Sequence, residues 1–192
     1  MANTYLLSDE AKRYLCCCYQ ILDGMIQGVS AAKLTQSISH NYIVQLLPQR
    51  RAAIRLCRNL LDVSNDGAVR RLTQRTAARE AEAVEALEAE LPAADQLTSP
   101  QMDLRLFQRR AEFIFRQMYA QMGAVPESNR VDILFLRQLI HHRQGGVRAA
   151  RTALQYEVST GLAPLLRSTI DTYSREVGQL RTLLSQRGWQ TA

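Results

Sequence analysis

The chain has 192 residues, of which 46% are apolar, and it carries 24 Lys and Arg against 18 Asp and Glu. This length and composition exclude a disordered chain and a collagen, and they allow one sizeable core or two small ones. Aromatic residues make up only 6%, with 9 Gly and 5 Pro. Because Ala, Leu, Arg and Gln dominate, the composition is typical of long helices and predicts an all-α fold.

Charge and hydropathy narrow the class of protein. No stretch approaches the roughly 18 uncharged apolar residues of a membrane span, and the N-terminus lacks the features of a secretory signal, so we expect a cytoplasmic protein. The net charge of +6 comes from residues 97–192. The arginines of residues 97–192 are spaced among Glu and Gln at helical intervals, which is typical of a solvated face. We therefore do not expect nucleic-acid binding.

Apolar residues recur at helical spacing and predict six helices. In chain order these span residues 8–28, 36–62, 67–90, 100–123, 128–157 and 160–187. Asn65, Asp66 and Gly67 break the pattern after the second helix, and Gly161 breaks it before the sixth. The segment from Pro92 to Pro100 is the predicted linker between the third and fourth helices.

Three consecutive cysteines, Cys16, Cys17 and Cys18, lie in the first predicted helix. Neighbouring side chains on a helix point about 100° apart, so the three cannot jointly hold one metal ion. Only Cys57 lies elsewhere, and the chain has no C-x-x-C motif. We therefore expect buried or half-buried free thiols.

The two halves of the chain align with each other without a gap when one is shifted by 93 residues. Gln45 and Leu46 then fall on Gln138 and Leu139, and Arg50 falls on Arg143. This pattern predicts a tandem duplication within one domain, with residues 1–95 and 96–192 as two three-helix repeats. A three-helix repeat leaves an apolar face uncovered, so the second and third helices of both repeats should form a four-helix core.

The predicted inward stripes carry charges. Arg50 and Arg143 interrupt the apolar stripes of the second and fifth helices, and Glu80 and Glu176 interrupt those of the third and sixth. Unpaired buried charges cost several kcal/mol, so we expect Arg50 to pair with Glu80, and Arg143 with Glu176, in a central polar layer that includes Tyr173. The alternative is that these long side chains reach water at the edge of the bundle.

Histidines 141 and 142 form the only local histidine cluster, and adjacent histidines on a helix diverge. His142 is the better candidate for the interior, either as a hydrogen-bonded member of the polar layer or as a metal ligand. Gln49 falls on His142 in the alignment of the halves and is assigned to the same layer. The neighbouring Gly145 and Gly146 are expected to permit close helix contact.

Two segments carry a family resemblance: FLRQLIHHRQGGVRAA at 135–150 and NYIVQLLPQRRAAIRLCRNLL at 41–61. They resemble the motif F-(hydrophobic)-x-x-M-I-P-H-H-x-x-A-I-x-M of the family called domain of unknown function 305. The resemblance implies a ferritin-like helical bundle whose paired histidines bind metal. Here the family's Pro-His-His reads Pro48-Gln49-Arg50 in one copy and His141-His142-Arg143 in the other, so only His142 occupies a family histidine position.

These departures shape the predicted function. An arginine stays protonated and cannot be an ordinary metal ligand, but its guanidinium can occupy the space of a cation beside carboxylates. We therefore predict a non-enzymatic, cofactor-free bundle in which Arg50 and Arg143 replace a metal, and which acts through a protein partner or a homo-oligomer. The alternative is a copper, zinc or iron protein that uses His142, Glu80 and Glu176.

Overall fold

The computed structural model describes residues 6–188, which form six α-helices and no strand. The helices are α1 (Asp9–Ser30), α2 (Ile38–Leu61), α3 (Gly67–Asp95), α4 (Gln101–Gly123), α5 (Val131–Ala153) and α6 (Leu162–Gln186). The predicted all-α fold is confirmed. The tandem duplication and the division into 1–95 and 96–192 stay predictions.

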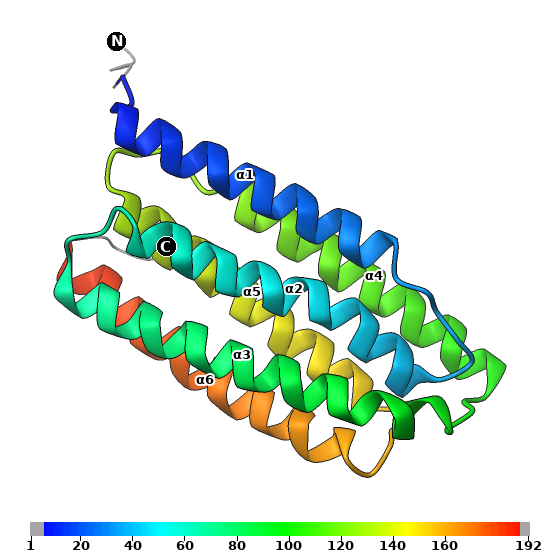
Figure 1. The fold of residues 1–192 in the computed structure, drawn as a ribbon. Coiled ribbons are helices and arrows are strands. Elements are labelled where there is room, and N and C mark those ends of the chain that lie inside the picture. The colour runs from blue at the N-terminus through cyan, green and yellow to red at the C-terminus, as the bar shows by residue number, and fades with distance from the viewer. Residues whose placement is uncertain (1–5, 189–192) are drawn as a thin grey trace.

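The helices stack in three layers of two, and each helix runs antiparallel to the one before it (Figure 1). The middle layer consists of α2 and α5, which α1 and α4 cover on one side and α3 and α6 on the other. The four helices α2, α3, α5 and α6 therefore form a bundle, as predicted for the core. Because α2 and α5 are covered on both sides, they are buried over most of their circumference.

Side-chain caps set the start of the first three helices. The hydroxyl of Ser8 accepts from the backbone N–H of Ala11, and the hydroxyl of Ser37 accepts from that of His40. The carboxylate of Asp66 caps α3 by accepting from Ala68 and Val69. Each cap satisfies backbone donors that the first turn of a helix leaves free.

The third helix runs further than predicted. It continues through Pro92 to Asp95, so the expected linker from Pro92 to Pro100 is wrong in its first residues. The reason lies in a tertiary contact: the hydroxyl of Ser37 donates to the carbonyl of Ala94 at 2.7 Å and satisfies a group that the helix end would leave unpaired.

The apolar core consists of two clusters, one toward each end of the bundle. One contains Leu60, Leu72 and Leu180, and the other contains Leu46 and Leu162. The middle of the bundle, between the two clusters, is polar. Within residues 6–188, no helix combines the length and apolar character that a membrane span requires.

Candidate functional site

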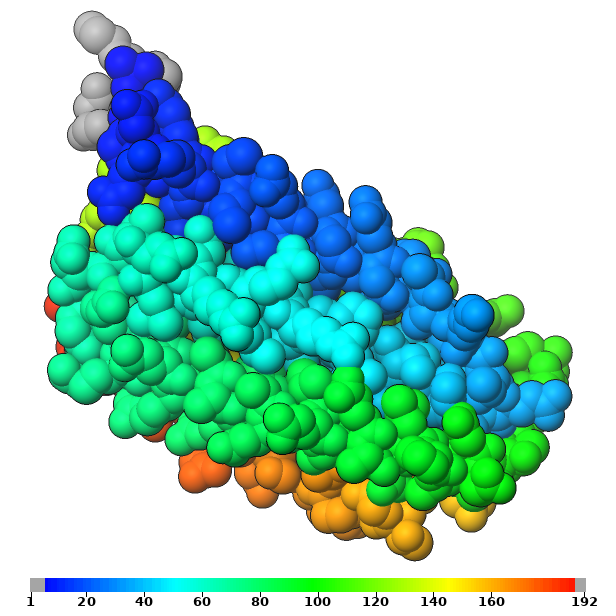
Figure 2. All heavy atoms as spheres, in the orientation of Figure 1, coloured from blue at the N-terminus to red at the C-terminus, as the bar shows by residue number. Residues whose placement is uncertain are grey.

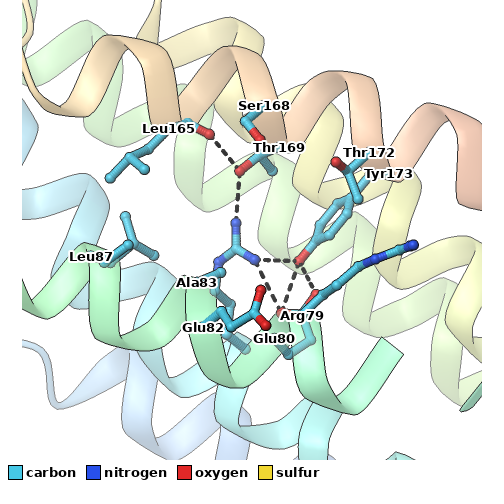
Figure 3. Close-up of a pocket in the computed structure, with 12 residues that line it drawn as sticks. Arg79, Glu80, Glu82, Ala83, Leu87, Leu165, Ser168, Thr169, Thr172 and Tyr173 are labelled. Atoms are coloured by element: carbon cyan, nitrogen blue, oxygen red, sulfur yellow. Dashed lines mark hydrogen bonds and ion pairs between the residues drawn. The ribbon is translucent and has the colours of Figure 1, made fainter. Parts of the chain in front are cut away.

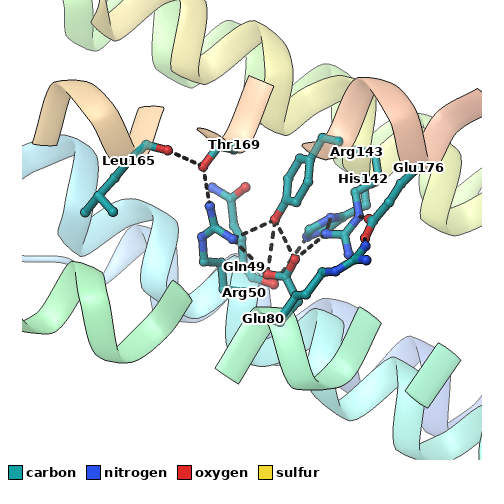
Figure 4. A network of polar contacts seen from close by, with 10 residues as sticks. Gln49, Arg50, Glu80, His142, Arg143, Leu165, Thr169 and Glu176 are labelled. Atoms are coloured by element: carbon teal, nitrogen blue, oxygen red, sulfur yellow. Dashed lines mark hydrogen bonds and ion pairs between the residues drawn. The ribbon is translucent and has the colours of Figure 1, made fainter. Parts of the chain in front are cut away.

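A layer of buried polar side chains crosses the middle of the bundle and is the candidate site (Figure 4). All four helices of the bundle contribute to it. We call the following residues the polar layer: Gln49 and Arg50 from α2, Glu80 from α3, His142 and Arg143 from α5, and Thr169, Tyr173 and Glu176 from α6.

Arg143 lies at the centre of the layer and is completely buried. Its Nη1 lies 2.7 Å from Oε1 of Glu80, and its Nε lies 2.7 Å from Oε2 of Glu176. Both approaches are ion contacts without the alignment of a hydrogen bond. The guanidinium carbon also lies 4.0 Å from the ring centre of Tyr173, so an aromatic face covers the cation.

Arg50 binds the same carboxylate from the other side. Its Nη1 donates to Oε2 of Glu80 at 3.1 Å and to the hydroxyl oxygen of Tyr173 at 3.0 Å. Its Nη2 donates to the hydroxyl oxygen of Thr169 at 2.7 Å. The Tyr173 hydroxyl in turn donates to Oε1 of Glu80 at 2.8 Å. Glu80 is therefore shared by two arginines and a tyrosine.

The contacts fix the charges of Glu80, Arg50 and Arg143. Burial alone raises the pKa of Glu80, but Arg143 and Arg50 outweigh it and hold this pKa below its ordinary value of 4.5. Burial alone lowers the pKa of Arg143, and Glu80 and the other neighbours reverse the effect and raise it. Glu80 is ionised and both arginines are protonated at neutral pH, so the layer is held by charge-assisted contacts.

His142 is neutral. Burial, and then the adjacent Arg143, lower its pKa from 6.5 to about 4. Its Nε2 lies 3.3 Å from the carbonyl oxygen of Gln49, which can only accept, so Nε2 carries the proton. The Nδ1 then faces Nη1 of Arg143 at 3.5 Å. The side-chain amide of Gln49 donates to the carbonyl of Gln45.

The residues proposed as metal ligands do not fit a metal ion in this arrangement. Nε2 of His142 is directed to a backbone carbonyl, and the carboxylates of Glu80 and Glu176 face guanidinium groups. Among residues 6–188, no three His, Cys, Asp or Glu side chains come together as a metal-binding group. The structure brings the predicted residues together, but as an ion-pair network rather than as a ligand set.

Comparisons with known proteins bear on this layer. The family described as a domain of unknown function, DUF305, matches residues 39–184, which include every member of the layer. The chain belongs to the DUF305 family. A solved structure, a DUF305 fragment from Deinococcus radiodurans, superposes with a TM-score of 0.59 at 20% identity. The match covers 81% of this chain and 98% of that one, and it shows a shared fold. No relative was found among curated proteins.

Two members of the network in this DUF305 chain were not predicted from the sequence. Thr169 accepts from Arg50, and its hydroxyl donates to the carbonyl of Leu165 at 2.8 Å. The sequence could have indicated Thr169, since it lies four residues before Tyr173 and so on the same face of the helix. Arg79, which is half exposed, donates to Oε1 of Glu176 at 3.1 Å. Arg79 lies beside the inward stripe of α3 rather than on it, so the sequence pattern did not indicate this contact.

A cleft between α3 and α6 leads from the surface to the layer (Figure 3). Its volume is about 320 Å³, and its walls include Leu87 and Leu165. Arg50, Glu80 and Tyr173 line it as well, so solvent comes close to the ion pairs. The Nη atoms of Arg50 already bind partners within the protein.

The cysteines are free thiols, as expected, although Cys16 is exposed rather than buried. Burial raises the pKa of Cys18 to about 11 and that of Cys57 to about 12. A thiol with so high a pKa is not ionised at neutral pH and is a weak nucleophile. These two side chains are therefore packing residues of the apolar core.

Proposed function

We propose that this DUF305 chain is a non-catalytic helical scaffold in which two arginines take the place of a metal ion. The observation that carries the proposal is the position of Arg143. Its guanidinium lies 2.7 Å from the carboxylates of Glu80 and Glu176, where a cation would be needed to hold two buried anions together.

The chemistry of the guanidinium supports this assignment. It stays protonated at every physiological pH, it binds carboxylates through several N–H groups, and it does not coordinate metals. A metal ion would need the same carboxylate oxygens. To admit one, the fully buried Arg143 would have to leave its ion pairs and its place over the Tyr173 ring, which is a strongly unfavourable change.

The acid–base properties of the layer argue against catalysis. With a pKa of about 4, His142 is a weak base, and its Nε2 is already engaged. Burial raises the pKa of the Tyr173 hydroxyl, which is held by Glu80. A general acid or base works best with a pKa near the operating pH. Neither group meets that condition, so we assign the chain an action through its surface.

Metal analysis tests the proposal. The protein is purified without affinity metals, its metal content is measured, and copper, zinc and iron are titrated against wild type, His142→Ala and Arg143→His. We expect no stoichiometric metal in wild type and no change in its melting temperature. Arg143→His places an imidazole beside Glu80 and Glu176 and should bind metal more tightly than wild type. Stoichiometric metal in wild type that is lost in His142→Ala would overturn the proposal and favour the metal-binding alternative.

A further inference from the structure

Several charges of α3 have partners within the described chain, as Arg70, Glu88 and Asp95 do, but those on its outer face have none. The first part of the helix, Gly67–Arg79, contains arginines and no acidic residue, and the second part, Glu80–Asp95, contains acidic residues and no Lys or Arg. The two blocks meet in the middle of the helix. In the first and last turns this order opposes the helix dipole, which favours acidic groups near the N-terminus and basic groups near the C-terminus.

Neighbouring like charges add to the conflict. Arg71 and Arg75 are spaced by one helical turn, as are Glu82 and Glu85, and like charges at this spacing destabilise a helix. All four side chains are exposed. Within residues 6–188 they form no ion pair or side-chain hydrogen bond, whereas Arg79 pairs with Glu176.

The exposed positions are symmetric about Ala78. We call the following exposed residues the outer face of α3: Arg71, Gln74, Arg75, Ala78, Ala81, Glu82 and Glu85. Arg71 lies seven residues before Ala78, and Glu85 lies seven residues after it. Seven residues are about two helical turns, or roughly 10 Å, so both side chains lie on the same face as Ala78. Part of α3 lies at the surface (Figure 2), and α6 borders this face along the cleft that Glu82 lines and along a groove that Arg71 and Arg75 line.

We propose that two copies of this chain associate through the outer face of α3, with the two helices antiparallel about a two-fold axis at Ala78. In that arrangement Arg71 of each copy faces Glu85 of the other. Arg75 of each copy lies beside Ala81 and Glu82 of the other. A two-fold interface uses the same patch twice and must be self-complementary, and this face meets that requirement.

The small side chains at the centre fit the same geometry. In the proposed dimer Ala78 of one copy faces Ala78 of the other, and Ala81 lies one turn away along the helix. Alanines at a helix crossing let the axes approach to about 8 Å, the lower end of the usual range. At that separation the flanking arginines and glutamates are within reach of each other.

The charge order also identifies the partner as a second copy. A nucleic acid or an anionic membrane would attract the arginine block and repel the glutamate block that follows it on the same face. A basic partner would be attracted by the glutamate block and repelled by the arginine block. A surface that matches both blocks must carry them in the opposite order, and the same helix reversed in direction does so.

Charge-exchange variants test the proposal by sedimentation. One variant carries Arg71→Glu with Arg75→Glu, and the other carries Glu82→Arg with Glu85→Arg. Each alone should raise the dimer dissociation constant by at least about tenfold, because like charges then face each other. An equimolar mixture should form a heterodimer, since an all-acidic face meets an all-basic one. Wild type should dissociate as salt rises.

The matched control is Arg105→Glu with Arg109→Glu, the same change at exposed positions of α4 in the opposite layer. It should leave the dimer unchanged, and circular dichroism should show that all variants keep their helix content. A wild-type monomer at every concentration would overturn the proposal, as would a dimer that survives either exchange. Two monomeric variants that fail to associate when mixed would also overturn it. Metal content plays no part in this test, so it is independent of the proposed function.

Discussion

The two ends of the bundle differ from its middle. At the ends, apolar side chains from α2, α3, α5 and α6 fill the interior, and Leu60 and Leu180 both belong to one such cluster. In the middle, the same helices bury two arginines and two glutamates. Apolar contacts are non-directional and tolerate exchange, whereas buried ion pairs need one arrangement of partners. The ends therefore supply most of the favourable burial, and the middle specifies how the helices align.

Removal of the central cation should have the largest effect. Arg143→Ala leaves Glu80 and Glu176 buried with less compensation, so we expect a loss of about 3–5 kcal/mol in the free energy of unfolding, measured with urea. The control is Arg151→Ala, at an exposed position of the same helix, with an expected change below about 0.5 kcal/mol. A loss below about 1 kcal/mol for Arg143→Ala would contradict a specifying role for the layer.

The pH dependence of stability should have the next largest effect, because His142 titrates in the middle of the bundle whereas the apolar ends do not. The unfolded chain protonates His142 near pH 6.5, but the folded chain holds it neutral down to about pH 4. Its contribution to stability is thus fully present above pH 6.5 and is lost as the pH falls from 6.5 to 4, by up to about 3 kcal/mol. In His142→Gln the fall over this window should be smaller. An identical pH profile for both proteins would show that the histidine is not held neutral.

Close packing beside the layer should matter less. A Cβ at Gly146 would lie 2.6 Å from Cε2 of Tyr173, too close for an ordinary contact. Gly146→Ala should therefore destabilise the fold by about 1–3 kcal/mol in thermal or urea unfolding. Gly178→Ala is the control, because a Cβ there meets nothing within 4 Å, and alanine in a helix should add up to about 1 kcal/mol. Equal effects at both positions would show that Tyr173 moves freely.

The smallest effect is expected at the edge of the layer. Arg79 reaches Glu176 from the surface, and its side chain is 52% exposed. Solvent screens such a pair, so Arg79→Ala should cost less than about 1 kcal/mol, and the loss should shrink at high salt. A loss as large as that of Arg143→Ala would show that solvent does not screen the pair of Arg79 and Glu176.

The sequence predicted the fold class and the helices well, because apolar residues at a helical period report directly on burial. It also placed Arg50, Glu80 and Arg143 on inward stripes, because a charge that interrupts an apolar stripe stands out. It did not reveal that Arg143 contacts Glu80 of the other half, because pairing across a bundle depends on how the helices are rotated. The predicted end of α3 was wrong because Ser37, whose contact extends the helix, is distant from that end in the sequence.

The sharing of Glu80 links the two halves of the chain. Arg143 from the second half binds a carboxylate of the first, and Arg50 from the first half binds Thr169 and Tyr173 of the second. Neither half can separate from the other without leaving a buried charge unpaired. The molecule should therefore unfold in a single cooperative transition, and proteolytic cleavage in the loop between α3 and α4 should leave two fragments that stay associated.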